Sequence, residues 1–457
     1  MMKPGALLST AFAALLALGQ AGCCSRFPLA KPVTGIHPKK EMTFSEDVAF
    51  LKKHVEVIVL GQGSGSPQVA VVPAYQGRVM TSTVGGGESQ SHGWINYDLI
   101  TAGEFGPHIN AFGGEDRFWL GPEGGQFSIF FKKSDPFDLE HWQTPAVIDT
   151  APYQVLSRTD SEVTFRHEAK IKNYSDTEFS IRIDRTVRLY NRVKISDLLG
   201  ADLPDGIHAV AYETENILTN TGDTAWTKQG GLLSIWILGM YKHSEQTTVL
   251  VPYVEGDEAK LGPIVNADYF GTVPADRLKV ADGVIRFSGD GQYRSKIGLT
   301  SQRAKPVLGS YDATRQLLTI VQYTKPEGAT DYVNSMWELQ AEPFKGDVVN
   351  SYNAPSWPLM LSRQSGHQAK YVRIKRGTAK TINHSGVRSS WWINGSPQRA
   401  MEPIQTTGSN TCFHGYHGDA KIQTKITNRM NTPMDIAISK LLPPYRTQSS
   451  MLGITTQ

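Results

Sequence analysis

The chain has 457 residues, of which 40% are hydrophobic and 19% are charged, and its formal net charge is +3. This composition is typical of a globular protein and excludes an intrinsically disordered or membrane-embedded chain. The small net charge gives no reason to expect a nucleic acid partner. The charge is unevenly spread, however, because residues 354–457 hold 13 Lys and Arg against three Asp and Glu.

The first residues are typical of a secretory signal peptide. Lys3 precedes the apolar run "ALLSTAFAALLALG" (6–19), which is too short to span a bilayer, and "QAGCCS" (20–25) follows. Small residues directly before Cys23 resemble a bacterial lipoprotein box, although Gln20 stands where such boxes usually have Leu. The alternative is a plain cleaved signal that leaves a free thiol.

Residues 1–23 are therefore interpreted as a signal of the lipoprotein type, with lipid on Cys23 as the membrane contact. Such a protein is exported to the periplasm or the outer membrane of a bacterium. Residues 24–44 then form a linker. Beyond Cys24 the only cysteine is Cys412, so no disulfide framework is expected and the core must hold the fold.

The first predicted element after the linker is a short helix over 44–54, "FSEDVAFLKKH", with Ser45 as a candidate N-cap. Beyond it, apolar and polar residues alternate with a period of two, as in "VTFRHEAKI" (163–171) and "FSIRIDRTVRLY" (179–190). No stretch up to residue 350 predicts an amphipathic helix of three turns. Further strands are predicted in 54–61, 68–73, 231–241, 247–253 and 315–323.

Turn signals such as "NTGD" (220–223) and "SGDGQ" (288–292) separate these strands. Many short strands without intervening helices indicate a sandwich or barrel, and the length of the region makes it a large one. No repeat of the length used by propeller blades is visible. We therefore expect an all-β protein with one large antiparallel domain over 45–353.

Four segments carry a family resemblance: "VVPAYQGRVMTSTVGG" (71–86), "GPHINAFGGEDRFWLGPEGGQFSIFF" (106–131), "YETENILTNTGDTAWTKQGGLLSIWILGMY" (212–241) and "WELQAEPFKGDVVNSYN" (337–353). Together they resemble an uncharacterised bacterial family that is exported and has the galactose-mutarotase-like supersandwich fold. The resemblance covers roughly residues 45–353 and implies a concave sheet that faces a carbohydrate; it does not imply a reaction.

The second of these segments is the main candidate for a sugar site, because it combines carboxylates, an Arg and a Gln with an aromatic ring. In a strand, Glu115, Arg117 and Trp119 would share one face, and Asp116 would point to the other. Glycine pairs on either side would allow close backbone approach. The alternative is a structural Glu–Arg pair with the Trp in the core. The residues predicted to bind substrate here are Asp116, Arg117, Trp119, Glu123 and Gln126.

Mutarotase chemistry needs a base and an acid, and the resemblance implies a Glu on a late strand and a His. We therefore take His108, Glu115 and Glu213 as candidate catalytic residues, and Glu338 and Asn350 as further substrate-binding residues. "HGYHGD" (414–419) only superficially resembles a metal cluster, so neither a metal nor another cofactor is expected.

Residues 354–457 depart from the family. After Asn353 the only acidic residues are Glu402, Asp419 and Asp435, so the expected late carboxylate is missing. Two interpretations remain open: a basic, weakly ordered tail that contacts an anionic surface, or a change of reading frame near residue 354.

Three classes of function follow from these observations. The first is an exported carbohydrate-active enzyme, of the epimerase, lyase or glycoside hydrolase type. The second is a non-catalytic sugar-binding lipoprotein that uses the same concave sheet. The third is an envelope protein with a structural or interaction role, in which the charged motif only braces the fold. Carbohydrate is the expected partner in the first two.

Overall fold

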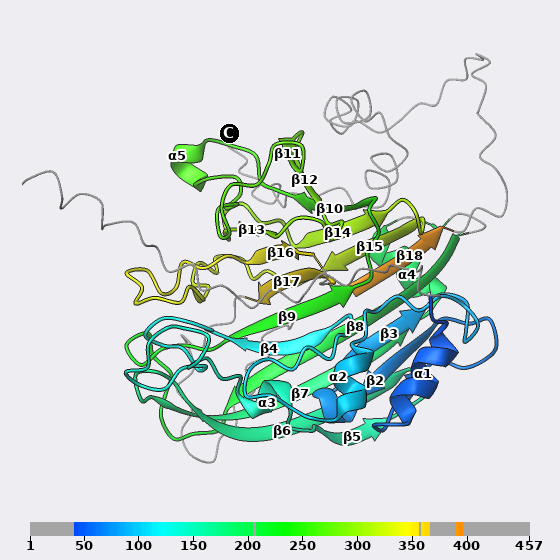
Figure 1. The fold of residues 1–457 in the computed structure, drawn as a ribbon, viewed down its shortest axis with the longest axis horizontal. Helices are drawn as coiled ribbons and strands as arrows, with labels where there is room; N and C mark the ends of the chain where they lie inside the picture. Colours follow the sequence, from blue (N-terminus) through cyan, green and yellow to red (C-terminus); the bar gives the residue numbers. More distant parts are fainter. Residues whose placement is uncertain (1–40, 201, 204–206, 356–357, 366–389, 396–457) are drawn as a thin grey trace, which may run out of the picture.

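The structure is a computed structural model that describes residues 41–200, 202–203, 207–355, 358–365 and 390–395. Its strands form three sheets, of ten, five and three strands (Figure 1). Neighbouring strands within each sheet are antiparallel. The predicted all-β class is confirmed.

The ten-stranded sheet contains the longest strands of the molecule. β6 and β7 reproduce the predicted strands 163–171 and 179–190 to within one residue at each end. In spatial order, the strands are β11 (Leu278–Ala281), β12 (Val284–Ser288), β10 (Thr247–Pro252), β14 (Val307–Asp312), β15 (Leu317–Gln322), β18 (Ser390–Gly395), β8 (Ile207–Asn220), β7 (Glu178–Tyr190), β6 (Glu162–Lys172) and β5 (Gln154–Arg158).

The two smaller sheets are built from short strands. The five-stranded sheet runs in the order β13 (Ser295–Leu299), β16 (Val349–Asn353), β17 (Leu359–Ser365), β9 (Ser234–Tyr241) and β4 (Arg117–Gly121). The three-stranded sheet consists of β1 (Ile58–Leu60), β2 (Gln68–Val72) and β3 (Arg78–Thr83).

One hydrophobic core joins the five-stranded and ten-stranded sheets. Phe118 and Ile237 of the smaller sheet belong to the same buried cluster as Ile183 and Val187 of the larger sheet. Alternate residues of β7 are buried in this core, as its period of two predicts. Arg185 occupies one of these inward positions and is also fully buried, so its charge needs a partner inside the protein.

The helices are short and most lie outside this core, although α3 (Ala146–Asp149) contributes Val147 and Ile148 to it. α1 (Phe44–Lys52) confirms the predicted N-terminal helix, but its N-cap is Thr43 rather than Ser45, in a capping box with Glu46. No helix among the described residues is long and apolar enough to cross a membrane. The remaining helices are η1 (Pro73–Tyr75), α2 (Tyr97–Ala102), α4 (Arg192–Leu199) and α5 (Glu258–Leu261).

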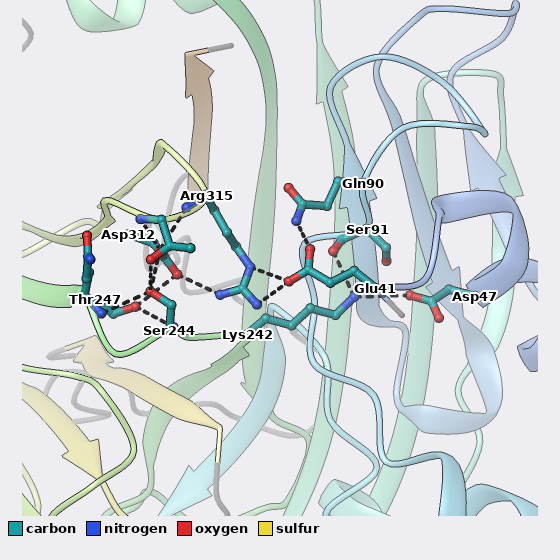
Figure 2. A network of polar contacts seen from close by, with 11 residues as sticks. Glu41, Asp47, Gln90, Ser91, Lys242, Ser244, Thr247, Asp312 and Arg315 are labelled. Carbon is teal, nitrogen blue, oxygen red and sulfur yellow. Dashed lines mark hydrogen bonds and ion pairs between the residues drawn. The ribbon is translucent and has the colours of Figure 1, made fainter. Parts of the chain in front are cut away.

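A polar network ties the region around α1 to strands of the ten-stranded sheet (Figure 2). Arg315 Nε donates to Glu41 at 2.9 Å, and its Nη1 lies 2.7 Å from Asp312. Lys242 donates to the Ser91 carbonyl at 2.9 Å and lies 3.7 Å from Asp47. Because these charges neutralise one another, we interpret the network as a structural link.

Two strands lie beyond residue 353, so the domain boundary predicted there is wrong. β17 lies between β16 and β9 in the five-stranded sheet, and β18 lies between β15 and β8. Period-two alternation is short in both segments, which is why the sequence did not reveal them. Cys23, "HGYHGD" (414–419) and most of the predicted tail lie outside the described residues.

Candidate functional site

The charged motif that opens β4 lies inside the protein. Glu115 and Asp116 have no exposed surface, and Arg117 and Trp119 are each 1% exposed. The predicted placement of these four side chains in an open cleft is therefore wrong. Their partners come from distant segments, which explains how charges are tolerated there.

Glu115 is held by uncharged donors. Its Oε1 accepts from the Ser82 backbone N–H at 2.7 Å, and its Oε2 accepts from the Tyr212 hydroxyl at 3.2 Å. Burial raises the pKa of Glu115 to about 8, and these hydrogen bonds only partly oppose that shift. The backbone N–H groups of Glu115 and Asp116 both donate to the Val79 carbonyl, at 2.8 and 3.4 Å, and this bulge-like irregularity breaks the predicted alternation.

Asp116 bridges the two main sheets. Its Oδ1 lies 2.7 Å from Arg185 of β7, and its Oδ2 lies 3.1 Å from Arg363 of β17. The Thr214 hydroxyl donates to the same carboxylate at 3.2 Å. This carboxylate therefore neutralises the inward-facing Arg185.

Arg117 and Trp119 share one face of β4, as predicted. The Arg117 guanidinium lies 4.1 Å from the centre of the Trp119 ring and 2.7 Å from Asp149 at the end of α3. Burial lowers the pKa of Arg117 to about 10, and Asp149 opposes that shift. These two residues therefore form the floor beneath a loop and not a binding surface.

The strand register carries this face across the whole five-stranded sheet, because paired residues lie on the same side. Trp119 pairs with Trp236 of β9, and Tyr352 of β16 pairs with Lys296 of β13. The face turned away from the ten-stranded sheet, called here the outward face, therefore presents the side chains of Arg117, Trp119, Trp236, Gln364, Asn350, Tyr352 and Lys296.

A small pocket lies on this outward face. Its volume is about 60 Å³, enough for a few water-sized groups but too small for a whole sugar ring. Aromatic, carboxylate, amide and ammonium groups all contribute to its wall. The lining residues are Glu123, Trp236, Tyr269, Lys296, Val333, Asn334, Ser335, Met336, Asp347, Asn350, Tyr352 and Gln364.

Two loops form one wall of the pocket, and the second glycine pair of the motif lets them meet. A Cβ on Gly124 would lie 2.2 Å from the Met336 carbonyl, and one on Gly125 would lie 2.7 Å from Gln340. Gln126 donates to the Gln340 carbonyl at 2.8 Å and accepts from its backbone N–H at 2.9 Å. The predicted close backbone approach is confirmed, and Gln126 clamps the loops rather than lining the pocket.

The ionisable groups of the pocket are only partly solvated. Burial lowers the pKa of Lys296 to about 8, although Asp347 and Glu123 favour its charged form. Burial also raises the pKa values of Glu123 and Asp347. The Lys296 ammonium lies 3.7 Å from the centre of the Tyr269 ring and 5.0 Å from that of Tyr352.

Some polar groups of the pocket already accept hydrogen bonds from other residues of the protein. Asp347 accepts from Asn266 at 2.9 Å through Oδ1 and from the Tyr269 hydroxyl through Oδ2. Glu123 accepts from the Trp119 indole N–H at 2.9 Å, through Oε1. We therefore interpret Asp347 as a group that orients Tyr269.

Other polar groups of the pocket can still form hydrogen bonds with a ligand. Within the described part of the chain, Glu123 Oε2, Lys296 Nζ and the Asn350 amide make no hydrogen bond. Trp236 is 3% exposed, and its buried Nε1 likewise lacks a partner among the described residues. A buried donor without a partner is costly unless a ligand or water completes it.

The three predicted catalytic residues are not brought together. His108 Nδ1 contacts the Trp142 carbonyl at 2.5 Å, and His108 does not line the pocket. Glu213 alternates with the inward-facing Tyr212, so it lies on the other face of β8, where Tyr190 donates to it. Glu115 is enclosed between the sheets, where no substrate can reach it.

The remaining predicted binding residues divide in the same way. Glu123 and Asn350 line the pocket, whereas Glu338 is exposed and lies outside the lining. Sequence reasoning missed Lys296, Tyr269, Trp236, Tyr352 and Asp347. Tyr352 and Asp347 lie inside the quoted segment 337–353, but nothing local distinguished them. No group of His, Cys, Asp and Glu within the described ranges could hold a metal ion.

Comparison with solved structures finds distant likenesses of the fold alone. A protein from Synechocystis sp. PCC 6803 is 14% identical, with 75% of this chain and 96% of that chain covered and a TM-score of 0.40. A galactose mutarotase-like protein from Lactobacillus casei ATCC 334 is 10% identical, with 74% and 99% covered and a TM-score of 0.39. A galactose mutarotase related enzyme from Lactobacillus acidophilus is 9% identical, with 74% and 97% covered and a TM-score of 0.35.

No curated protein matches the chain. A family model matches residues 42–361, which is most of the chain and includes β4, β13, β16 and every pocket-lining residue except Gln364. The match ends within β17, which agrees with a domain that continues past residue 353. The chain belongs to this uncharacterised family, a family of unknown function (DUF6786).

Proposed function

We propose that the protein binds a neutral carbohydrate in the pocket on the outward face of the five-stranded sheet. The observation that carries the proposal is a set of polar groups around one cavity that make no hydrogen bond to the described residues: Glu123 Oε2, Lys296 Nζ, the Asn350 amide and Trp236 Nε1. The set contains both hydrogen-bond donors and acceptors. A ligand rich in hydroxyl groups satisfies both kinds, because each hydroxyl donates and accepts.

The charges of the pocket favour a neutral ligand over an acidic one. Two carboxylates, Glu123 and Asp347, surround the single ammonium of Lys296. An anionic ligand would meet their repulsion, whereas a diol would bridge Glu123 and Lys296 without adding charge. The rings of Tyr269, Tyr352 and Trp236 supply apolar surface for the C–H faces of a sugar.

The volume of about 60 Å³ limits how much of the ligand enters. One hydroxyl-bearing edge of a sugar fits, and the rest of the ring would lie at the mouth of the pocket. The groups that touch this edge are a carboxylate and an ammonium, which are also the groups that general acid–base catalysis uses. The pocket therefore supports sugar binding more strongly than it supports catalysis.

The proposal includes export. The leader over residues 1–23 and Cys23 support a lipid-anchored protein of the bacterial envelope, where extracellular sugars are met. Metabolic labelling with a fatty acid tests this part. Label should enter the wild-type protein and be lost in Cys23→Ser, and an unlabelled wild type would overturn the anchor without affecting the sugar site.

Calorimetry and ligand-observed NMR on a panel of neutral sugars test the site. Lys296→Met and Glu123→Gln should each weaken binding by about 10- to 100-fold, because each removes a hydrogen bond to a charged group. Glu338→Gln is the matched control, since this exposed carboxylate lies outside the pocket. NMR exchange between anomers then separates an enzyme from a binding protein. Wild-type affinity in Lys296→Met, or no sugar bound by the wild type, would overturn the proposal.

A further inference from the structure

Two pairs of a cation and an aromatic ring lie at the start of the edge strand β13. Lys296 lies over the Tyr269 ring inside the pocket, at 3.7 Å. Two residues earlier, the Arg294 guanidinium lies 4.2 Å from the centre of the Phe270 ring. A second cation–aromatic pair, Arg294 and Phe270, therefore lies outside the pocket lining and close in sequence to the first.

The chain geometry places the second pair next to the first. Arg294 directly precedes β13 and Lys296 is the second residue of that strand, so their Cα atoms are at most about 7 Å apart. The aromatic partners are consecutive in the chain, and their segment runs beside β13 through the bridge between Asn266 and Gly298. The spacing is comparable to the size of one sugar ring.

The outer pair is exposed, unlike the inner one. Phe270 is 44% exposed although Arg294 covers one side of its ring. Tyr293, whose hydroxyl donates to the Thr272 carbonyl at 3.4 Å, is 38% exposed, and Met336, which lines the pocket, is 43% exposed. Exposed large apolar side chains near a polar pocket are typical of a ligand site.

We infer that the site takes an oligosaccharide of at least two sugar units, with the second ring stacked on Phe270. The inference rests on the proposed function and extends it from one sugar edge to a chain. Stacking on the guanidinium holds the Phe270 ring in one orientation, so little side-chain freedom is lost when a sugar covers its open side.

The test compares a neutral monosaccharide with its disaccharide and trisaccharide by calorimetry. The wild type should bind the disaccharide about tenfold more tightly than the monosaccharide, because the second ring covers an aromatic face. Phe270→Ala should abolish this gain and leave the monosaccharide Kd unchanged, whereas Phe270→Trp should retain it. Phe105→Ala is the control, since Phe105 is 55% exposed and packs edge-on to Phe112 away from β13.

The outcomes separate this inference from the proposed function. Equal affinity for the monosaccharide and disaccharide in the wild type, or a gain that survives Phe270→Ala, would overturn the second subsite alone. A wild-type protein that binds none of the three saccharides would overturn the sugar site itself.

Discussion

Replacing Asp116 with Asn should destabilise the protein by about 3–5 kcal/mol, the usual cost of breaking a buried ion pair from one side. Asp116 has no exposed surface and is the only described hydrogen-bond partner of the Arg363 guanidinium. Arg185 would keep the Asn216 side chain, at 2.6 Å, and the Gly77 carbonyl, at 3.0 Å. Most of the loss should therefore come from the unpaired charge of Arg363.

Equilibrium urea unfolding, followed by tryptophan fluorescence, measures this loss as a lower midpoint with little change in slope. Asp176→Asn is the matched control, because its pair with Lys133 is equally short, at 2.7 Å, but exposed. The control should cost at most about 1 kcal/mol. Adding Arg363→Met to Asp116→Asn should recover part of the stability. An Asp116→Asn protein within about 1 kcal/mol of wild type would refute the reasoning.

Three further predictions follow from the same contacts. Gly125→Ala should cost about 2 kcal/mol or more, because its φ is +80° and its Cβ would meet Gln340, whereas Gly328→Ala, with φ +71° and open space, should cost about 1 kcal/mol in urea unfolding. The pKa of Glu115, raised from 4.5 to about 8, means that only the folded state keeps this proton between those values, so stability should fall as the pH rises from 4.5 to 8. Glu115→Gln should flatten that slope in unfolding measured across this range, and an unchanged slope would contradict the assignment. Sugar affinity should fall as the pH rises through about 8, where Lys296 loses its proton, and calorimetry at pH 7 and pH 9 should show no such fall in Lys296→Arg.

Much of the fold could be predicted from the sequence because β-strands repeat with a period of two. The strands predicted at 163–171 and 179–190 agree with β6 and β7, and the short run at 68–73 agrees with β2. When one face of a strand is buried, apolar and polar residues alternate along that strand, so the strand can be predicted without knowing its distant contacts. The same rule placed Arg117 and Trp119 on one face of β4.

Tertiary structure alone decided which of those faces is open. Asp116 forms ion pairs with Arg185 and Arg363 on two other strands. A motif with the composition of a sugar site is therefore a buried structural link between the sheets. Glu123 and Lys296 line one pocket although β4 and β13 are the opposite edges of one sheet. The local sequence pattern predicts whether a residue faces inward or outward. It does not predict which distant strand packs beside that residue. The identity of that neighbouring strand determines whether a charge is neutralised within the protein or remains available to a ligand.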